Sequence, residues 1–348
     1  MNDSKRVDGS YWVWRGRANP HVIELVKRLF AGHGEQRSEE LIRWQYLEHL
    51  GGAYVAVAHT AAGLLDGAAA IYSAFPVKWR SGGRSVTAAQ SFDTLTTELH
   101  RGRGLFVKLA SMVYEDMAAD DVELVYGVPN GQSYGTFVNR LGWQSLDPLP
   151  FLMRPIGSRY LRVRLGVRHP RIEPASATAF THAEIVDRVP PDVDDLVARS
   201  ECSMLDGVIR DGAYLRWRLR RPGSSYRLTE IRESSGELMG FAASELVLKH
   251  GAAVGYVLDG IFDQSRQDVG DCLVESIIAD FNRRGADIAM AWSSDESEFS
   301  RCLRRNRFVT LPSRLRPIEL HLGGRSFSAR TPITRDALKF SYLDSDTV

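Results

Sequence analysis

The chain has 348 residues, enough for two domains of roughly 150 residues each. An apolar share of 44% and a charged share of 25% are those of an ordinary globular protein, and a net charge of +1 gives no support to bulk binding of nucleic acid or anionic membranes. The three cysteines are far apart in the sequence, which argues against a disulfide framework or a cysteine metal site.

Two observations bear on the cellular compartment. The first ten residues are polar and lack the apolar core of a signal peptide. No stretch approaches the ~18 uninterrupted apolar residues that a membrane-spanning helix needs. We therefore expect a soluble, cytoplasmic protein with no metal, no nucleic-acid partner and no membrane partner. The sequence leaves the oligomeric state open.

The predicted elements of the first half begin with two helices and continue with antiparallel strands. A glycine-containing turn then leads into a helix, a buried strand, a short helix and a last strand. The expected helices cover residues 21–30, 38–47, 105–117 and 133–141, and the expected strands cover 53–58, 67–72, 77–80, 84–97, 123–128 and 151–153. This order predicts an α/β fold of the α+β kind, a mixed and mostly antiparallel sheet flanked by helices, rather than a doubly wound one.

The segment 92–106 changes from a strand-like to a helix-like period at residues 101–104, Arg-Gly-Arg-Gly. A strand that passes through glycines into a helix offers free backbone N–H groups at the positive end of the helix dipole. The two arginines add charge, so the turn is predicted to hold phosphate. It lacks the Lys-Ser or Lys-Thr of a P-loop, and Val107 stands where a dinucleotide fingerprint has its third glycine. An ordinary tight turn is the other interpretation.

Residues 154–174 form the expected connection between the halves. They carry six arginines, with apolar residues between several of them. The segment is interpreted either as an edge strand followed by a solvated connector or as a basic wall beside an anionic ligand. The expected division of the chain is a first domain at residues 1–157, a basic linker at 158–174, a second domain at 175–330 and a C-terminal tail at 331–348.

The two halves resemble each other in sequence. Residues 41–46 (Leu-Ile-Arg-Trp-Gln-Tyr) match residues 214–219 (Tyr-Leu-Arg-Trp-Arg-Leu), and each run precedes two short strands. Asp93 and Asp259 each stand eleven residues before a glycine of the following turn. Because several such matches occur in the same order, the chain is predicted to be a duplication of one fold.

Arg101-x-x-Gly104 on a strand-to-helix turn, followed by a strand, Asn130 and then Gly142-Trp143, resembles the GNAT acetyltransferase superfamily. The family signature is Gln/Arg-x-x-Gly-x-Gly/Ala, with an asparagine after the next strand and a Gly-aromatic pair closing the following helix. The resemblance covers most of the first half well and the second half weakly. It implies two tandem GNAT-like domains, of which the second is degenerate.

The resemblance also implies a ligand. In this family, backbone N–H groups of the turn bind the pyrophosphate of an acyl-coenzyme A, the co-substrate. Its pantetheine arm pairs like an extra strand with the strand before the turn, in a gap where two parallel strands splay apart. The implied binding residues are Leu95, Thr96, Thr97, Arg101, Gly102, Arg103, Gly104, Leu105, Phe106, Asn130 and Ser133.

Two positions depart from the family pattern. Phe106 stands at the sixth signature position, where only the backbone N–H is needed if the ring points into the core. Many relatives carry a tyrosine on the last helix that protonates the leaving thiolate, and here Phe137 and Val138 stand near that place. Tyr134, one helical turn earlier, is the nearest proton donor, although it is also suited to packing.

Acyl transfer to an amine needs a neutral amine, a polarised carbonyl and a proton for the thiolate. Asp93 and Glu98 are the candidate bases, on or just after the strand that lines the gap, and Asp93 is also a candidate for orienting the amine. Because Asp93 recurs as Asp259, a structural role is predicted for it as well. A strand amide of Thr96 or Thr97 is expected to polarise the carbonyl.

In the second half, the equivalent turn carries Asp268 and Asp271. Two carboxylates beside a phosphate would repel it. The second copy is therefore not expected to bind coenzyme A. It is expected to brace the first copy and to wall off an acceptor site between the two.

The sequence thus predicts an N-acyltransferase that moves an acetyl or another acyl group to the amine of a small molecule. An amino sugar, a sugar nucleotide or a natural-product amine is the expected acceptor. One alternative is a Fem-type aminoacyl transferase, which also resembles two tandem copies of this fold but uses aminoacyl-tRNA. Another is a non-catalytic acyl-coenzyme A sensor or scaffold, which the missing tyrosine favours.

Overall fold

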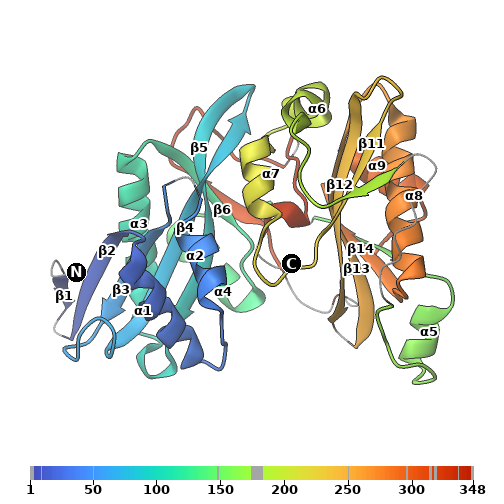
Figure 1. The fold of residues 1–348 in the computed structure, drawn as a ribbon. Coiled ribbons are helices and arrows are strands. Elements are labelled where there is room, and N and C mark those ends of the chain that lie inside the picture. Colours follow the sequence, from blue (N-terminus) through green and yellow to red (C-terminus); the bar gives the residue numbers. More distant parts are fainter. Residues whose placement is uncertain are drawn as a thin grey trace.

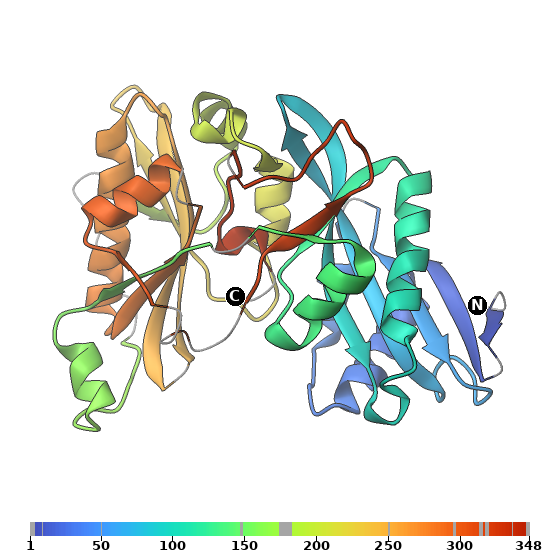
Figure 2. The same ribbon diagram turned by 180° about the vertical axis from the view of Figure 1, so that it is seen from behind.

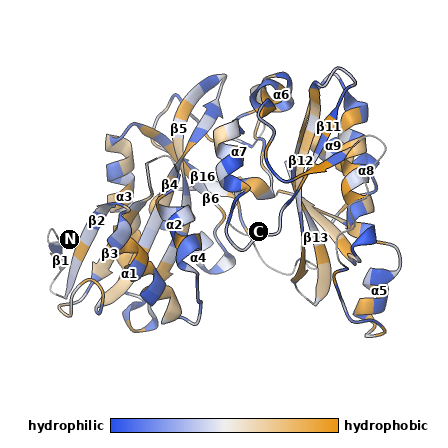
Figure 3. Ribbon diagram, in the orientation of Figure 1, coloured by the Kyte–Doolittle hydropathy of each residue, from blue (hydrophilic) through white to orange (hydrophobic). Residues whose placement is uncertain are grey.

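The computed structural model describes residues 4–8, 10–49, 51–146, 149–173, 183–249, 251–294, 297–312, 316, 320–335 and 337–345. They form two twisted sheets that lie side by side, each with helices packed on it (Figure 1). The central strands of both sheets are largely apolar (Figure 3). The expected fold, two mixed and mostly antiparallel sheets flanked by helices, is confirmed.

The first sheet has the strand order β1-β2-β3-β4-β5-β6-β16-β7, and β10 pairs with β4 outside this path. Its strands are β1 (Lys5–Asp8), β2 (Tyr11–Arg17), β3 (Tyr54–His59), β4 (Ala68–Ser81), β5 (Arg84–Thr96), β6 (Val122–Gly127), β7 (Gln144–Ser145), β10 (Gly207–Val208) and β16 (Gly323–Ser326). Helices α1 (Pro20–Ala31) and α2 (Glu39–Tyr46) contribute to one core, and α3 (Leu105–Ala119) and α4 (Gly131–Leu141) to another, on the opposite face.

The second sheet has the order β15-β8-β14-β13-β12-β11-β9. Its strands are β8 (Phe151–Pro155), β9 (Glu184–Val186), β11 (Arg227–Arg232), β12 (Leu238–Lys249), β13 (Ala252–Phe262), β14 (Ile288–Trp292) and β15 (Val309–Thr310). The remaining helices are α5 (Arg159–Arg164), α6 (Val193–Arg199), α7 (Gly212–Arg218), α8 (Gln267–Arg283) and α9 (Glu298–Arg305), with 3-10 turns η1 (Glu98–His100), η2 (Glu201–Ser203) and η4 (Tyr342–Asp344). In the described residues no helix is both long enough and apolar enough to cross a membrane.

Local sequence chemistry explains where the helices of the first half begin and end. The Asn19 side chain accepts a hydrogen bond from the His21 N–H, just before Pro20 opens α1. The Ser38 side chain caps α2 in the same way. Helix α4 ends at Gly142, whose φ of 69° is a left-handed conformation that glycine adopts without strain.

The duplication predicted from the sequence is visible in the fold. The series β3-β4-β5-α3-β6-α4 recurs as β11-β12-β13-α8-β14-α9, and each series contains one parallel strand pair. Trp44 and Trp217, which the repeat aligns, stack across the boundary with ring centroids 4.7 Å apart. Each indole N–H donates to the other residue's carbonyl oxygen, at 2.9 Å and 3.1 Å. The two copies therefore face each other with an approximate twofold relation.

Three strands do not follow the expected division into a first domain at residues 1–157 and a second domain at 175–330: β8, β10 and β16. The expected last strand of the first half, β8, pairs with β14 in the second sheet. Strand β16, from the second half, pairs with β6 in the first sheet. The first half thus gives β8 to the second sheet, and the second half gives β16 and the short β10, which pairs with β4, to the first sheet. The expected linker contains a helix, α5 (Figure 2). The hairpin β1–β2 at the N-terminus was not expected.

Candidate functional site

The parallel strands β5 and β6 separate near the middle of the first sheet. Their pairing runs from Thr87 and Val122 to Gln90 and Tyr126 and then stops, although β5 continues to Thr96. A cavity of about 220 Å³ lies in the opening. It is lined by Phe30, Arg37, Ser91, Phe92, Asp93, Thr94, Gly127, Val128, Pro129, Asn130, Ser133, Phe137 and Trp143. This opening is the splayed gap that the sequence analysis expects.

The gap-facing edge of β5 has unpaired backbone groups. The Thr97 N–H donates to the Ala69 carbonyl of β4 at 2.9 Å. Since backbone polar groups alternate between the two edges of a regular strand, those of Thr96 are directed into the gap. The Thr96 carbonyl accepts from the Arg101 side chain, so the Thr96 N–H is the group on this edge that an extended ligand would pair with. The N–H of Thr97, one of the two expected to polarise a carbonyl, is already occupied.

The turn between β5 and α3 has the geometry of an anion site. Gly102 and Gly104 have φ values of 76° and 72°, which favour glycine. Gly104 is the N-cap of α3 and supplies no side-chain acceptor, and the first turn of the helix contains no acidic residue. In the described part of the chain, no hydrogen bond occupies the N–H groups from Gly102 to Val107, and the first such bond runs from Lys108 to Gly104. These free donors and the helix dipole fit a phosphate.

The two arginines of the turn are exposed and lie beside these donors. The Arg101 Nε donates to the Thr96 carbonyl at 3.3 Å, so its side chain folds over the end of β5. Arg103 lies over the ring of Tyr11, 5.9 Å from its centroid. Both positive charges are therefore available to a bound phosphate. The ion pair that a phosphate would compete with is the weak 3.9 Å contact between Arg101 and Glu98.

An aromatic cluster closes the floor of the gap. Phe106 packs on Phe137 with ring centroids 4.9 Å apart, and Phe137 packs on Trp143 at 4.2 Å. The Trp143 indole N–H donates to the Tyr114 hydroxyl at 2.8 Å. A Cβ added at Gly127 would lie 3.2 Å from the Trp143 ring, which shows how closely the floor is packed. Phe106 thus points into the core, as its place in the signature requires.

Asp93 lies at a bulge of β5, with a φ of 44°. Arg37 donates to both of its carboxylate oxygens, at 2.7 Å and 2.6 Å, and the Tyr46 hydroxyl donates at 2.7 Å. Burial raises the pKa of the Asp93 carboxyl, while Arg37 and then Tyr46 act to lower it. Both bonds from Arg37 come from its Nη1, and together with the Tyr46 hydroxyl they fix the direction of the carboxylate, which makes it a strong orienting group.

The other predicted catalytic residues lie away from the cavity. Glu98 is 82% exposed on η1 and lines a separate cavity of about 660 Å³ beside Leu99 and His100. Tyr134 stacks on His321 with ring centroids 4.0 Å apart and does not line the gap. The structure thus brings Asp93 to the gap and leaves Glu98 and Tyr134 outside it.

The remaining predicted binding residues divide between the gap and the core. Asn130 and Ser133 line the gap, and the Asn130 side chain caps α4 by accepting from the N–H groups of Gln132 and Ser133. Leu95 is half-buried and packs against the core on the α1–α2 face. Leu105 is fully buried at the start of α3, so only its backbone faces the turn.

Sequence reasoning missed Arg37, although the repeat contains a signal for it. Arg37 precedes Ser38, the N-cap of α2, and Arg210 precedes Asp211, the N-cap of α7. Arg210 donates to Asp259 at 2.5 Å, so the pair Arg37–Asp93 recurs in the second copy. An arginine thus stands directly before the N-cap of the equivalent helix in both halves. This recurrence is the sequence signal that an arginine pairs with the recurring aspartate.

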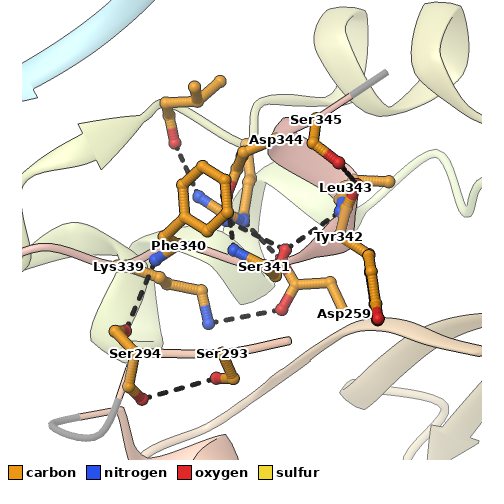
Figure 4. A network of polar contacts seen from close by, with 12 residues as sticks. Asp259, Ser293, Ser294, Lys339, Phe340, Ser341, Tyr342, Leu343, Asp344 and Ser345 are labelled. Carbon is orange, nitrogen blue, oxygen red and sulfur yellow. Dashed lines mark hydrogen bonds and ion pairs between the residues drawn. The ribbon is translucent and has the colours of Figure 1, made fainter. Parts of the chain in front are cut away.

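In the second copy, the chain itself fills the place equivalent to the gap (Figure 4). Ser294, just beyond β14, donates its N–H to the Phe340 carbonyl at 3.1 Å. The Lys339 ammonium lies 3.5 Å from Asp259 on β13. The C-terminal segment thus lies between the ends of the two parallel strands. The turn is also different, because Arg266 pairs with Asp268 and a Cβ at Gly270 would collide with Phe262 and Cys302.

Comparisons with known proteins agree with this geometry. Residues 18–146 match the family model of the acetyltransferase (GNAT) domain. No curated protein matches the chain. Among solved structures, a GCN5-related N-acetyltransferase from Anabaena variabilis is similar with a TM-score of 0.63 and 14% identity, over 91% of this chain and 73% of that one.

Two further structures share the fold. A conserved Enterococcus faecalis protein, named a probable N-acyltransferase, has a TM-score of 0.62 and 12% identity, over 91% of this chain and 72% of that one. Saccharomyces cerevisiae N-myristoyltransferase with bound myristoyl-CoA has a TM-score of 0.63 and 12% identity, over 100% of this chain and 92% of that one. Residues 18–146 are therefore identified as an acetyltransferase (GNAT) domain, and the second half of the chain repeats the order of its helices and strands.

Proposed function

We propose that the protein is an N-acyltransferase that moves a short acyl group from acyl-coenzyme A to the amine of a small molecule. One observation carries the proposal: the free N–H groups of the Gly102–Gly104 turn lie at the end of the same strand whose unpaired edge opens into the gap. Pyrophosphate would bind to the turn, and the pantetheine arm would pair with the Thr96 N–H and pass Thr94, which lines the cavity.

The reaction needs little more than positioning. The amine nitrogen attacks the thioester carbonyl carbon, so that the C–N bond forms and the C–S bond breaks. The nitrogen loses one proton and the leaving thiolate takes up one proton, so the products are an amide and a free thiol. The Thr96 N–H, on the gap-facing edge of β5, is suited to polarise the carbonyl. Asp93 would orient the amine, since its Oδ1 accepts only from Arg37 and keeps a free lone pair.

The closed floor favours a short acyl group. Phe137 and Trp143 are buried at the bottom of a cavity of about 220 Å³, and this volume must also hold the attacking amine. An acetyl group fits such a space, whereas a long chain would need the aromatic cluster to open. The same small volume favours a small acceptor, for which an amino sugar, a sugar nucleotide or a natural-product amine remains the proposed class.

A second candidate is a non-catalytic acyl-coenzyme A sensor. Two observations favour it: Phe137 stands where many relatives have a proton-donating tyrosine, and Arg37 occupies both oxygens of Asp93. A Fem-type aminoacyl transferase is less favoured, because its donor would not use the free N–H groups of the turn.

Both the transferase and the sensor must bind the coenzyme. Calorimetric titration of coenzyme A and acetyl-coenzyme A into the protein tests this binding. We expect binding by the wild type and at least tenfold weaker binding by Gly104→Asp, which adds a negative charge beside the phosphate. Gly251→Asp is the matched control, because Gly251 also has a φ of 72° and open space around it but lies in the second copy. Absence of binding by the wild type would refute the proposal, and equal effects of the two substitutions would refute the site.

Release of thiol from acetyl-coenzyme A across a panel of amines separates an enzyme from a sensor. Turnover with any small amine, lost in Gly104→Asp and retained in Gly251→Asp, supports the transferase. Binding of acetyl-coenzyme A without turnover on a panel covering amino sugars, amino acids and polyamines supports the sensor.

A further inference from the structure

Helix α5 and the turn after it form an exposed apolar surface on the second copy. Leu161, Leu165 and Val167 are 62%, 76% and 75% exposed. Large aliphatic side chains so exposed and so close together are uncommon on a monomeric protein, and they indicate a surface that contacts something else. We call residues 158–168 the α5 projection.

The same segment is strongly basic. Residues 154–172 contain six arginines and no acidic residue. Arg168 is paired with Asp287 at 3.4 Å and Arg171 with Glu173 at 2.7 Å. Arg162 and Arg164 are exposed and have no acidic partner in the part of the chain that the structure describes. The net charge of +1 for the whole chain therefore hides a local excess of positive charge.

The position of the α5 projection leaves it accessible. It lies at the outer end of the second sheet, on the side away from the first copy, in both views (Figure 1 and Figure 2). Apolar and charged residues alternate along it (Figure 3). Helix α5 begins four residues after β8, the strand that crosses from the first half, so the exchange of strands places the projection there.

We propose that the α5 projection docks the protein on an anionic lipid surface. The three aliphatic side chains would enter the interface between headgroups and acyl chains, while Arg162 and Arg164 would contact lipid phosphates. Arginines next to exposed leucines suit this role, because the aliphatic part of each arginine can lie along the apolar boundary with its charge in the headgroup layer.

A nucleic acid fits the surface less well. It would use the arginines but would stack bases on aromatic rings rather than contact leucine and valine. The one aromatic residue of the α5 projection, Tyr160, is half-buried under Arg164, which lies 6.0 Å from its ring centroid. The proposal is independent of the proposed function, because neither the gap nor the glycine turn takes part in it.

Co-sedimentation of the full chain with phosphatidylcholine vesicles, with and without phosphatidylserine, tests the proposal. We expect binding only when phosphatidylserine is present. Arg162→Gln with Arg164→Gln should weaken it about 25-fold, from ~1 kcal/mol for each arginine. Leu165→Ser with Val167→Ser should weaken it at least tenfold, since two aliphatic groups no longer leave water.

The control is Leu248→Ser with Arg43→Gln, which removes an exposed leucine and an exposed arginine elsewhere and should leave binding unchanged. Circular dichroism of each variant confirms that it is folded. Failure of the wild type to bind phosphatidylserine vesicles would overturn the proposal. A second result would also overturn it: Leu165→Ser with Val167→Ser weakens vesicle binding by less than about threefold, and an oligonucleotide displaces the vesicles. The surface would then be a general polyanion site.

Discussion

At the scale of single residues, the candidate site is defined by what holds Asp93. The carboxylate is fixed by two hydrogen bonds from Arg37 and one from Tyr46, and the same arginine–aspartate pair recurs where the second copy has no open gap. Recurrence without a gap shows that the pair has a structural role in the fold. In the first copy the pair lies in the wall of the cavity, so it can also position a ligand.

Asp93→Asn separates these roles. We expect the affinity for acetyl-coenzyme A to stay within about threefold, and kcat/KM for the amine to fall about 10- to 100-fold, since an orienting charge is lost. If Asp93 orients the amine and does not accept its proton, the pH–rate profile should keep its shape. Loss of the acidic limb of the profile in the variant would instead identify Asp93 as the base. Asp259→Asn is the control for destabilisation, because it breaks the equivalent pair away from the gap.

Phe137 is the residue on which the short acyl group depends. Phe137→Ala should remove its contacts with Phe106 and Trp143 and leave a hole in the floor. We expect a loss of about 3 to 5 kcal/mol in the free energy of unfolding, measured by urea denaturation. The surviving folded protein should gain affinity for hexanoyl-coenzyme A relative to acetyl-coenzyme A. An unchanged ratio would show that the acyl group does not lie on this floor.

At the scale of elements, the order of helices and strands follows from sequence periodicity, because that information is local. The expected helices at 21–30 and 133–141 are α1 and α4, and the expected strand at 123–128 is β6 within one residue at each end. The partner of a short strand is not local information. Nothing in Phe151–Pro155 or Gly323–Ser326 says which sheet it joins, so the exchange of β8 and β16 could not be predicted.

The same distinction explains the site. The glycine turn at Gly102 and Gly104 and the helix start at Asn130 could be predicted, because a turn and a helix cap need particular residues at fixed spacing. Glu98 and Tyr134 were misplaced relative to the gap, since their direction depends on how η1 and α4 are rotated against the sheet. The filling of the second gap by residues 339–341 depends on contacts with Ser293 and Ser294, just after β14 and some fifty residues earlier in the chain.

The C-terminal segment is a structural element of the boundary between the copies. Arg210 and Asp344, each 1% exposed, are 2.5 Å apart, and Asp344 also accepts from the Ser341 N–H. Asp344→Asn should therefore destabilise the protein by about 3 kcal/mol, because it leaves a buried arginine with one fewer partner charge. Urea denaturation measures the loss. Glu39→Gln, which breaks an exposed pair with Arg43, should cost less than about 0.5 kcal/mol, and equal losses in both variants would contradict the argument.

At the scale of the whole molecule, the two copies meet through aromatic stacking that includes one titratable ring. His49 stacks on Trp217 with ring centroids 3.9 Å apart, and it also contacts Phe75 and Tyr214. Its Nε2 is buried and has no hydrogen-bond partner in the described part of the chain. Burial lowers the pKa of His49 from its ordinary value to about 4, with the Asp211 charge opposing the shift. The boundary between the copies is thus built around a neutral imidazole.

This boundary should weaken in acid. Above the unfolded pKa of about 6.5, His49 is neutral in both states and contributes no pH dependence. Between about pH 6.5 and pH 4 the unfolded chain binds a proton and the folded one does not, so stability falls as the pH falls, by up to about 3 kcal/mol.

The variant His49→Phe tests this, because it keeps an aromatic ring and removes the titratable group. The stability difference between wild type and His49→Phe, measured by urea denaturation at several pH values, should therefore change by that amount across the window. His21→Gln, at an exposed position on α1, is the control. If the stability difference between wild type and His49→Phe stays constant with pH, His49 is protonated within the folded boundary and the prediction is wrong.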